Sequence, residues 1–200
     1  FTQKELIYMS NHIDFYFDFI SPYSYIAYKN ITKINNVKFN FKPILLGGLH
    51  NLVDITAPAF NKFKLKNMKN DCELISKKNK ISFIWNSKFP INSLYIMRGY
   101  LTVDESKKKD YLETFFNAYW QNDTDLTNEK NIIQLIENLS INYEEFFKSI
   151  SKQEIKDELK KFTSEAFKKE IFGAPTFIVN NKIFWGQDRL NYALDEFKNN

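Results

Sequence analysis

The chain has 200 residues, of which 44% are hydrophobic and 26% charged, so it can bury a sizeable core. Its net charge of +4 comes from lysines scattered among acids rather than from a basic block, which argues against nucleic acid as a partner. No apolar run approaches the ~20 residues of a membrane helix, and no secretory signal is visible. We therefore expect a cytoplasmic protein without a membrane partner, and its single cysteine, Cys72, offers no disulfide and no metal site.

The first part of the chain is predicted to form a β-α-β unit. Apolar and polar residues alternate over residues 12–19 and again over residues 37–43, which is typical of strands. Between them, Ser21 and Pro22 indicate a helix start, because serine accepts hydrogen bonds from free amides and proline has no amide hydrogen. We expect this helix to end near Ile34.

Residues 45–172 are predicted to be helical, with a loop at the sequence WNSKFPIN. Apolar residues recur there at helical spacing, in the stripes Leu65, Met68, Cys72 and Ile75; Tyr111, Phe115, Phe116, Tyr119 and Trp120; and Ile132, Ile133, Leu135, Ile136 and Leu139. Ser151 and Glu154 resemble a capping box, which predicts that another helix opens at Ser151. The predicted buried face of that helix comprises Ile155, Leu159, Phe162 and Ala166.

The C-terminal part returns to strands. The sequence GAPTFIV is a short apolar run, Asn180 and Asn181 form a turn, and KIFW is a second strand that Gly186 ends. A last amphipathic helix carries Leu190, Ala193, Leu194 and Phe197. The order βαβ, helical block, ββα predicts an α/β fold whose sheet is built from both ends of the chain.

This order resembles the thioredoxin fold, and five motifs extend the resemblance. They are FYFDFISPYSYIA, LLGGL, FNAYW, FGAPTF and FWGQDRL, and in this order they resemble the 2-hydroxychromene-2-carboxylate isomerase family from about Ile13 to Phe197. That family is related to kappa-class glutathione transferases and DsbA-type oxidoreductases. The resemblance implies a discontinuous thioredoxin-like domain, 12–44 plus 173–198, with a helical domain, 45–172, inserted, and it implies a homodimer.

The resemblance makes Ser21 the catalytic serine, which binds glutathione. An anion is favoured at a helix N-terminus, where free amides carry about half a positive charge, and a hydroxyl there can donate a hydrogen bond to a thiolate. Redox relatives carry cysteines where Ser21 and Ser24 stand, so this site cannot cycle between dithiol and disulfide. Whether Ser24 shares the role of Ser21 or faces solvent stays open.

The resemblance also implies residues that hold the rest of glutathione. Pro175 matches a cis-proline, which would turn Ala174 outward to pair with the glutathione backbone. Asp188 would accept the γ-glutamyl ammonium and Gln187 could assist, while Arg189 fits an ion-pair partner better.

A lysine is expected to meet the glycine carboxylate of glutathione. Lys64 is the predicted residue, although Lys62, Lys66 and Lys69 lie in the same run. Kappa relatives also use an asparagine in the preceding loop. Ile55 stands at that position here, so Asn51 or a backbone group would have to replace the contact.

The resemblance implies an isomerase that uses a thiolate held by Ser21 on a small aromatic or unsaturated acid. Tyr23, Trp85 and Asn92 are placed on the acceptor-substrate side, although core packing or loop structure also explains each of them. A kappa-like glutathione transferase stays open as an alternative. So does a non-catalytic thioredoxin-fold binding module, in which the serines only cap a helix.

Overall fold

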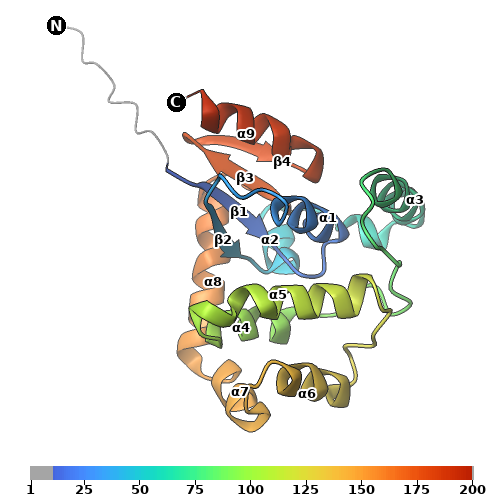
Figure 1. The fold of residues 1–200 in the computed structure, drawn as a ribbon, viewed down its shortest axis with the longest axis vertical. Coiled ribbons are helices and arrows are strands. Elements are labelled where there is room, and N and C mark those ends of the chain that lie inside the picture. Colours follow the sequence, from blue (N-terminus) through green and yellow to red (C-terminus); the bar gives the residue numbers. More distant parts are fainter. Residues whose placement is uncertain (1–10, 200) are drawn as a thin grey trace, which may run out of the picture.

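The N-terminal β-α-β unit is present as predicted (Figure 1). The computed structural model describes residues 11–199. Strand β1 spans Ile13–Phe17, helix α1 spans Pro22–Ile31 and strand β2 spans Phe39–Pro43. Helix α1 ends earlier than predicted, because the amides that follow bond three residues back and tighten the chain into a turn.

The sheet joins the two ends of the chain. Its order is β2-β1-β3-β4, with β1 parallel to β2 and antiparallel to β3. Strands β3 (Thr176–Val179) and β4 (Lys182–Trp185) form the predicted hairpin. Asn180 and Asn181 both have positive φ, 52° and 61°, which is the backbone that a two-residue hairpin turn requires.

A helical block separates the two halves of the sheet, as predicted. Figure 1 shows α4 and α5 below the strands, α6 and α7 below those, and α8 running back along one side toward the sheet. The block comprises α2 (Leu46–Leu52), a short 3-10 turn (Pro58–Phe60), α3 (Lys62–Lys78), α4 (Leu94–Thr102), α5 (Glu105–Trp120), α6 (Glu129–Asn138), α7 (Tyr143–Ile150) and α8 (Gln153–Lys168). The last helix, α9 (Leu190–Lys198), follows β4.

The predicted capping box at Ser151 is wrong. Helix α8 begins at Gln153, and its N-cap, Lys152, makes no side-chain capping bond. Ser151 instead terminates α7, and its hydroxyl donates to the carbonyl of Phe147 at 2.8 Å. A serine in a last helical turn can bond back to the carbonyl four residues earlier, and here that local bond replaces the predicted cap.

The two faces of the sheet bury different clusters, because successive strand residues point to opposite sides. Phe15 and Phe17 of β1 belong to a large core shared with α1, α9, α4 and α5. Tyr16 between them belongs to a smaller cluster with side chains of α2 and α8. The Phe17 ring lies 5.4 Å from that of Tyr100 on α4, so the large core continues from the sheet into the helical block.

The predicted α/β thioredoxin-like fold with a helical insertion is confirmed. The division into domains at 44/45 and 172/173 stays a prediction. Within residues 11–199, no helix is both long and apolar enough to cross a bilayer.

Candidate functional site

Ser21 lies at the point where the two ends of the chain meet. It is the N-cap of α1, and its Oγ accepts a hydrogen bond from the Ser24 amide at 3.1 Å. The same hydroxyl donates to the carbonyl of Ala174 at 2.9 Å. Ser21 is only 4% exposed, so the hydroxyl is held in one position at the N-terminus of the helix.

The loop that contacts Ser21 has the predicted cis-proline. The Ala174–Pro175 bond is cis, and both residues are buried. The Pro175 carbonyl accepts a hydrogen bond from the Gly186 amide at 2.9 Å. The structure therefore brings together Ser21, the 174–175 loop and the segment that begins at Gly186.

The segment after Gly186 carries Gln187 and Asp188 in a 3-10 turn, Gln187–Arg189, which contacts α1. Gly186 has φ of 106°, and a Cβ there would lie 2.6 Å from Asp188 Oδ1, so only glycine lets the carboxylate fold back over the chain. Asp188 is exposed, and Arg189 Nη1 lies 3.3 Å from its Oδ2. Arg189 is thus an ion-pair partner, as the sequence suggested.

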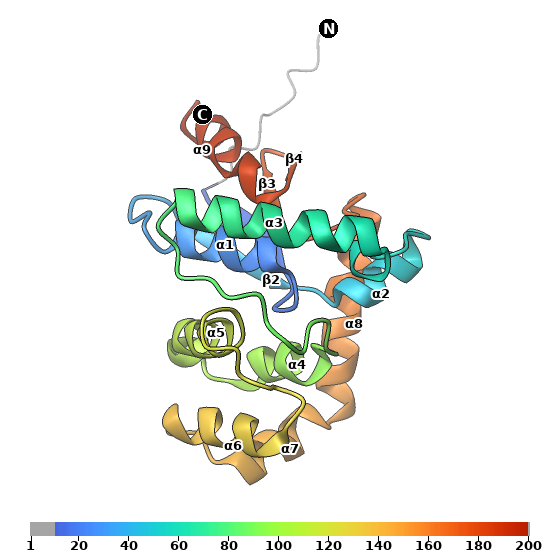
Figure 2. The same ribbon diagram turned by 90° about the vertical axis from the view of Figure 1, so that its right-hand side faces the viewer.

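Lys64 lies in the first turn of α3, which packs across α1 (Figure 2). Its amide donates to the N-cap side chain of Asn61, and its own side chain is exposed. Lys62, Lys66 and Lys69 are exposed on the same helix, so the choice among the four lysines stays a prediction. Ile55 is also exposed, and its amide donates to the carbonyl of His50.

The three residues predicted on the acceptor side have separate partners. Tyr23 donates its hydroxyl hydrogen to Asp71 of α3 at 2.8 Å, and burial together with this bond raises the pKa of Tyr23. Trp85 packs its ring against Phe89 and Trp120, at centroid distances of 4.8 and 5.8 Å. Trp85 therefore contributes to an aromatic cluster in the core.

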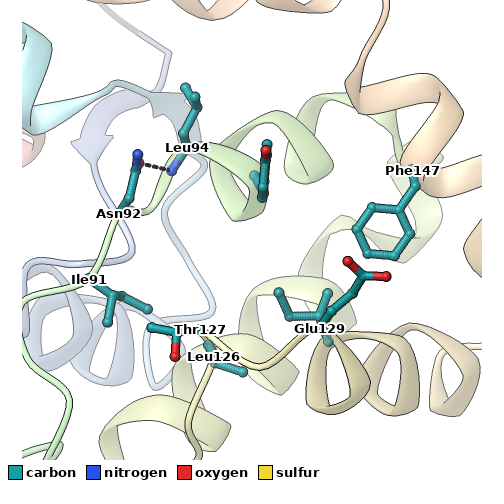
Figure 3. Close-up of a pocket in the computed structure, with 9 residues that line it drawn as sticks. Ile91, Asn92, Leu94, Leu126, Thr127, Glu129 and Phe147 are labelled. Carbon is teal, nitrogen blue, oxygen red and sulfur yellow. Dashed lines mark hydrogen bonds between the residues drawn. The ribbon is translucent and has the colours of Figure 1, made fainter.

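Asn92, the third acceptor-side residue, lines a cavity of about 290 Å³ between the start of α4 and helices α6 and α7 (Figure 3). Its Oδ1 accepts the Leu94 amide at 2.9 Å, so the side chain caps the helix start. The cavity walls are mostly apolar, with the carboxylate of Glu129 among them. A negative group would repel an anionic substrate, so this cavity does not suit an organic acid.

Two residues near Ser21, Ser24 and Asp18, are more deeply buried than the sequence indicated. Ser24 is fully buried, so it does not face solvent, and its Oγ has no hydrogen-bond partner among the described residues. Asp18, which strand alternation placed on the polar side of β1, is also fully buried. Its position three residues before a predicted helix cap was a signal that it could bond to the turn.

Asp18 accepts three hydrogen bonds. They come from the Ile20 amide at 3.1 Å, the Leu46 amide at 2.7 Å and the Ser93 hydroxyl at 3.1 Å. Burial raises the pKa of Asp18 to about 6, and the three hydrogen bonds limit the rise. Within the described part of the chain, no ion pair includes this carboxylate.

The raised pKa of Asp18 predicts an unusual pH dependence of stability. The pKa is about 6 in the folded protein and about 3.9 in an unfolded chain. Between these values the unfolded chain binds fewer protons, so the free energy of unfolding falls as pH rises. We expect the ionisation of Asp18 to lower the free energy of unfolding by about 3 kcal/mol between about pH 4 and pH 6. Above that range Asp18 should cause no further change. Urea unfolding of the wild type and Asp18→Asn across these pH values measures the effect, and parallel curves would contradict it.

Cys72 lies inside the protein, beside Tyr23, the second residue after Ser21. It is fully buried on α3, and burial raises the pKa of its thiol. No group of three His, Cys, Asp or Glu side chains within residues 11–199 has the arrangement of a metal site.

The chain belongs to the family of the DSBA-like thioredoxin domain, whose model matches residues 12–198. Its fold is similar to that of a solved 2-hydroxychromene-2-carboxylate isomerase, with a TM-score of 0.85, 23% identity and 94% of each chain covered. The curated 2-hydroxychromene-2-carboxylate isomerase of Sphingobium xenophagum is 23% identical over 189 residues, covering 92% of this chain and 96% of its own. A solved cytosolic disulfide reductase, DsbM from Pseudomonas aeruginosa with GSH, matches with a TM-score of 0.65, 12% identity and coverage of 94% and 96%.

These matches confirm the predicted DsbA-like thioredoxin family and the predicted similarity to 2-hydroxychromene-2-carboxylate isomerases. Glutathione, the substrate, a homodimer and the roles of the individual site residues stay predictions.

Proposed function

We propose that this protein is a glutathione-dependent isomerase of substrates like 2-hydroxychromene-2-carboxylate, with the thiolate held by Ser21. The observation that supports it best is the meeting of the Ser21 hydroxyl, at the N-terminus of α1, with the Ala174–Pro175 loop. The isomerase relative whose fold is so similar gives the reaction class, and the same fold is known with GSH in DsbM.

The residues around Ser21 fit glutathione. No hydrogen bond is recorded for the Ala174 amide among the described residues, so it is available to pair with a peptide backbone. Asp188 is exposed beside this loop and can accept an ammonium group, while exposed Lys64 can meet a carboxylate. A negatively charged sulfur at Ser21 would be favoured by the free amides of the first turn of α1.

When bound, glutathione would supply a thiolate for reversible addition to a conjugated carbon of the substrate; the double bond that the addition makes single could then rotate, and elimination would return the glutathione. The chain's contribution is to keep that sulfur ionised. The Ser21 hydroxyl donates to the neutral carbonyl of Ala174, and in a glutathione complex it would donate to the sulfur instead. Hydrogen bonds to charged acceptors are about twice as strong as those to neutral ones, so this exchange favours the thiolate over the thiol.

The test is to incubate the protein with 2-hydroxychromene-2-carboxylate and a substoichiometric amount of glutathione. We expect full conversion to the isomer with the glutathione recovered, measured by chromatography of both compounds. Consumption of glutathione into a stable adduct would instead indicate a transferase. If calorimetry detects no binding at millimolar glutathione and no conversion occurs, the proposal is wrong and a non-catalytic binding module is favoured.

A further inference from the structure

Three helix N-termini converge on one buried residue, Asp18. Its backbone carbonyl accepts the amide of Ser21, the N-cap of α1, at 3.1 Å. Its Oδ2 accepts the amide of Leu46, the first residue of α2, and the hydroxyl of Ser93, the N-cap of α4. Asp18 therefore contacts the starts of a helix that carries the candidate site and of two helices from the inserted block.

In neither α2 nor α4 does the side chain of the N-cap residue make a capping hydrogen bond. The N-cap of α2 is Leu45, which has no polar side chain, and the hydroxyl of Ser93 makes no capping bond within α4. The first amides of a helix need an acceptor, and burying one without it costs about 1–3 kcal/mol. The Asp18 carboxylate supplies the acceptor for Leu46 and also binds the Ser93 hydroxyl.

The same carboxylate shapes the turn that leads to Ser21. Its Oδ1 accepts the Ile20 amide, two residues on, and this side-chain bond is how aspartate fixes a turn. Phe19, between Asp18 and Ile20, is bonded to the helical block as well. The Phe19 amide donates to Met97 Sδ of α4 at 3.3 Å, and its carbonyl accepts Trp120 Nε1 of α5 at 3.1 Å.

We propose that Asp18 is a positioning residue for Ser21, because its carboxylate fastens the 18–21 turn to the N-termini of α2 and α4. The expected effect of Asp18 on the thiol pKa of bound glutathione rests on the proposed function. All three recorded partners of the carboxylate are donors, so the ionised form satisfies them without needing a proton. Asparagine has the same shape, but its NH₂ group would face one of these donors.

The experiment compares Asp18→Asn with Asp14→Asn. Asp14 lies in the preceding strand, β1, and its carboxylate bonds to Asn40 outside the site. Amide hydrogen exchange is measured in both, with the amides of α6 as an internal reference for global stability. We expect the Ile20, Ser21 and Leu46 amides to exchange about 10-fold faster in Asp18→Asn only. Equal exchange of these amides in the two variants would overturn the proposal.

The second readout is the thiol pKa of bound glutathione, followed by absorbance at 240 nm. We expect Asp18→Asn to raise it by about one unit, a tenfold change in the acid dissociation constant of the thiol, and Asp14→Asn to leave it unchanged. An unchanged thiol pKa in Asp18→Asn would overturn the link between Asp18 and the sulfur. If the wild type binds no glutathione, the proposed function fails, while hydrogen exchange still decides whether Asp18 positions Ser21.

If Asp18→Asn does not fold, Ser93→Ala replaces it in the hydrogen-exchange experiment. It removes one of the three donors and leaves the carboxylate bound to the turn. We expect a smaller acceleration, about threefold, at the Leu46 amide that shares Oδ2 and at Ile20. The absence of any acceleration at both amides would contradict the proposal.

Discussion

Replacing Ser21 with alanine should bring the thiol pKa of bound glutathione back to that of the free tripeptide and reduce turnover about 100-fold. The reason is the loss of the hydroxyl that caps α1 and contacts the Ala174 loop. Stabilisation of a thiolate by ~2 pKa units corresponds to about 2.7 kcal/mol, which is a factor of about 100. Absorbance at 240 nm over a pH titration gives the thiol pKa, and initial rates of isomerisation give turnover.

A control separates this effect from the loss of a helix cap. Ser21→Ala should also lower the free energy of unfolding by about 1 kcal/mol, because an N-cap is removed. Asn142 caps α7 through a bond from the Glu145 amide, far along the chain from the site, so Asn142→Ala should cost similar stability without changing the thiol pKa. A lowered thiol pKa that survives in Ser21→Ala would show that the serine only caps the helix.

Replacing Gly99 with alanine should lower the free energy of unfolding by about 3 kcal/mol, which is at the upper end for overpacking of a core. In an open helical position the same change would stabilise by up to about 1 kcal/mol, because alanine is the better helix former. In α4, however, the new Cβ would overlap Tyr111 Oη and lie 2.5 Å from Phe146 Cζ. Both rings are buried and cannot move away freely. Urea unfolding measures the change.

Gly47→Ala is the matched control for this prediction. Gly47 is also inside a helix, α2, but a Cβ there would meet nothing within 4 Å. We expect it to be neutral or slightly stabilising. Adding Tyr111→Phe to Gly99→Ala should restore part of the loss, because it removes the overlapping hydroxyl. Equal stability of Gly99→Ala and Gly47→Ala would mean that α4 shifts to make room.

Local signals predicted the parts of this fold that local forces determine. The Ser21–Pro22 helix start and the Asn180–Asn181 turn are confirmed, since caps and tight turns depend on neighbouring residues. Ser151 shows the limit of such signals, because two local hydrogen bonds competed and the sequence did not reveal which one forms.

The sequence alone was a weaker guide to which residues come together in the candidate site. Strand alternation put Asp18 on a polar face, but its carboxylate is buried against the starts of α2 and α4, and only the tertiary structure shows this. The same limit applies to Trp85, whose aromatic neighbours come from distant segments. Ser21 and Pro175 were predicted through a resemblance of motifs, and the hydrogen bond that links Ser21 to Ala174 could not be derived from spacing.

The hydrogen bond from Ser21 to Ala174 joins residues that are 153 positions apart. Strand β1 likewise gains its second neighbour only from β3, near the end of the chain. During synthesis, therefore, the first strand and helix leave the ribosome long before their partners exist. Contacts so distant in sequence close slowly, so the helical block is available to fold while the site is still open. The site is therefore complete only once the C-terminal hairpin has docked.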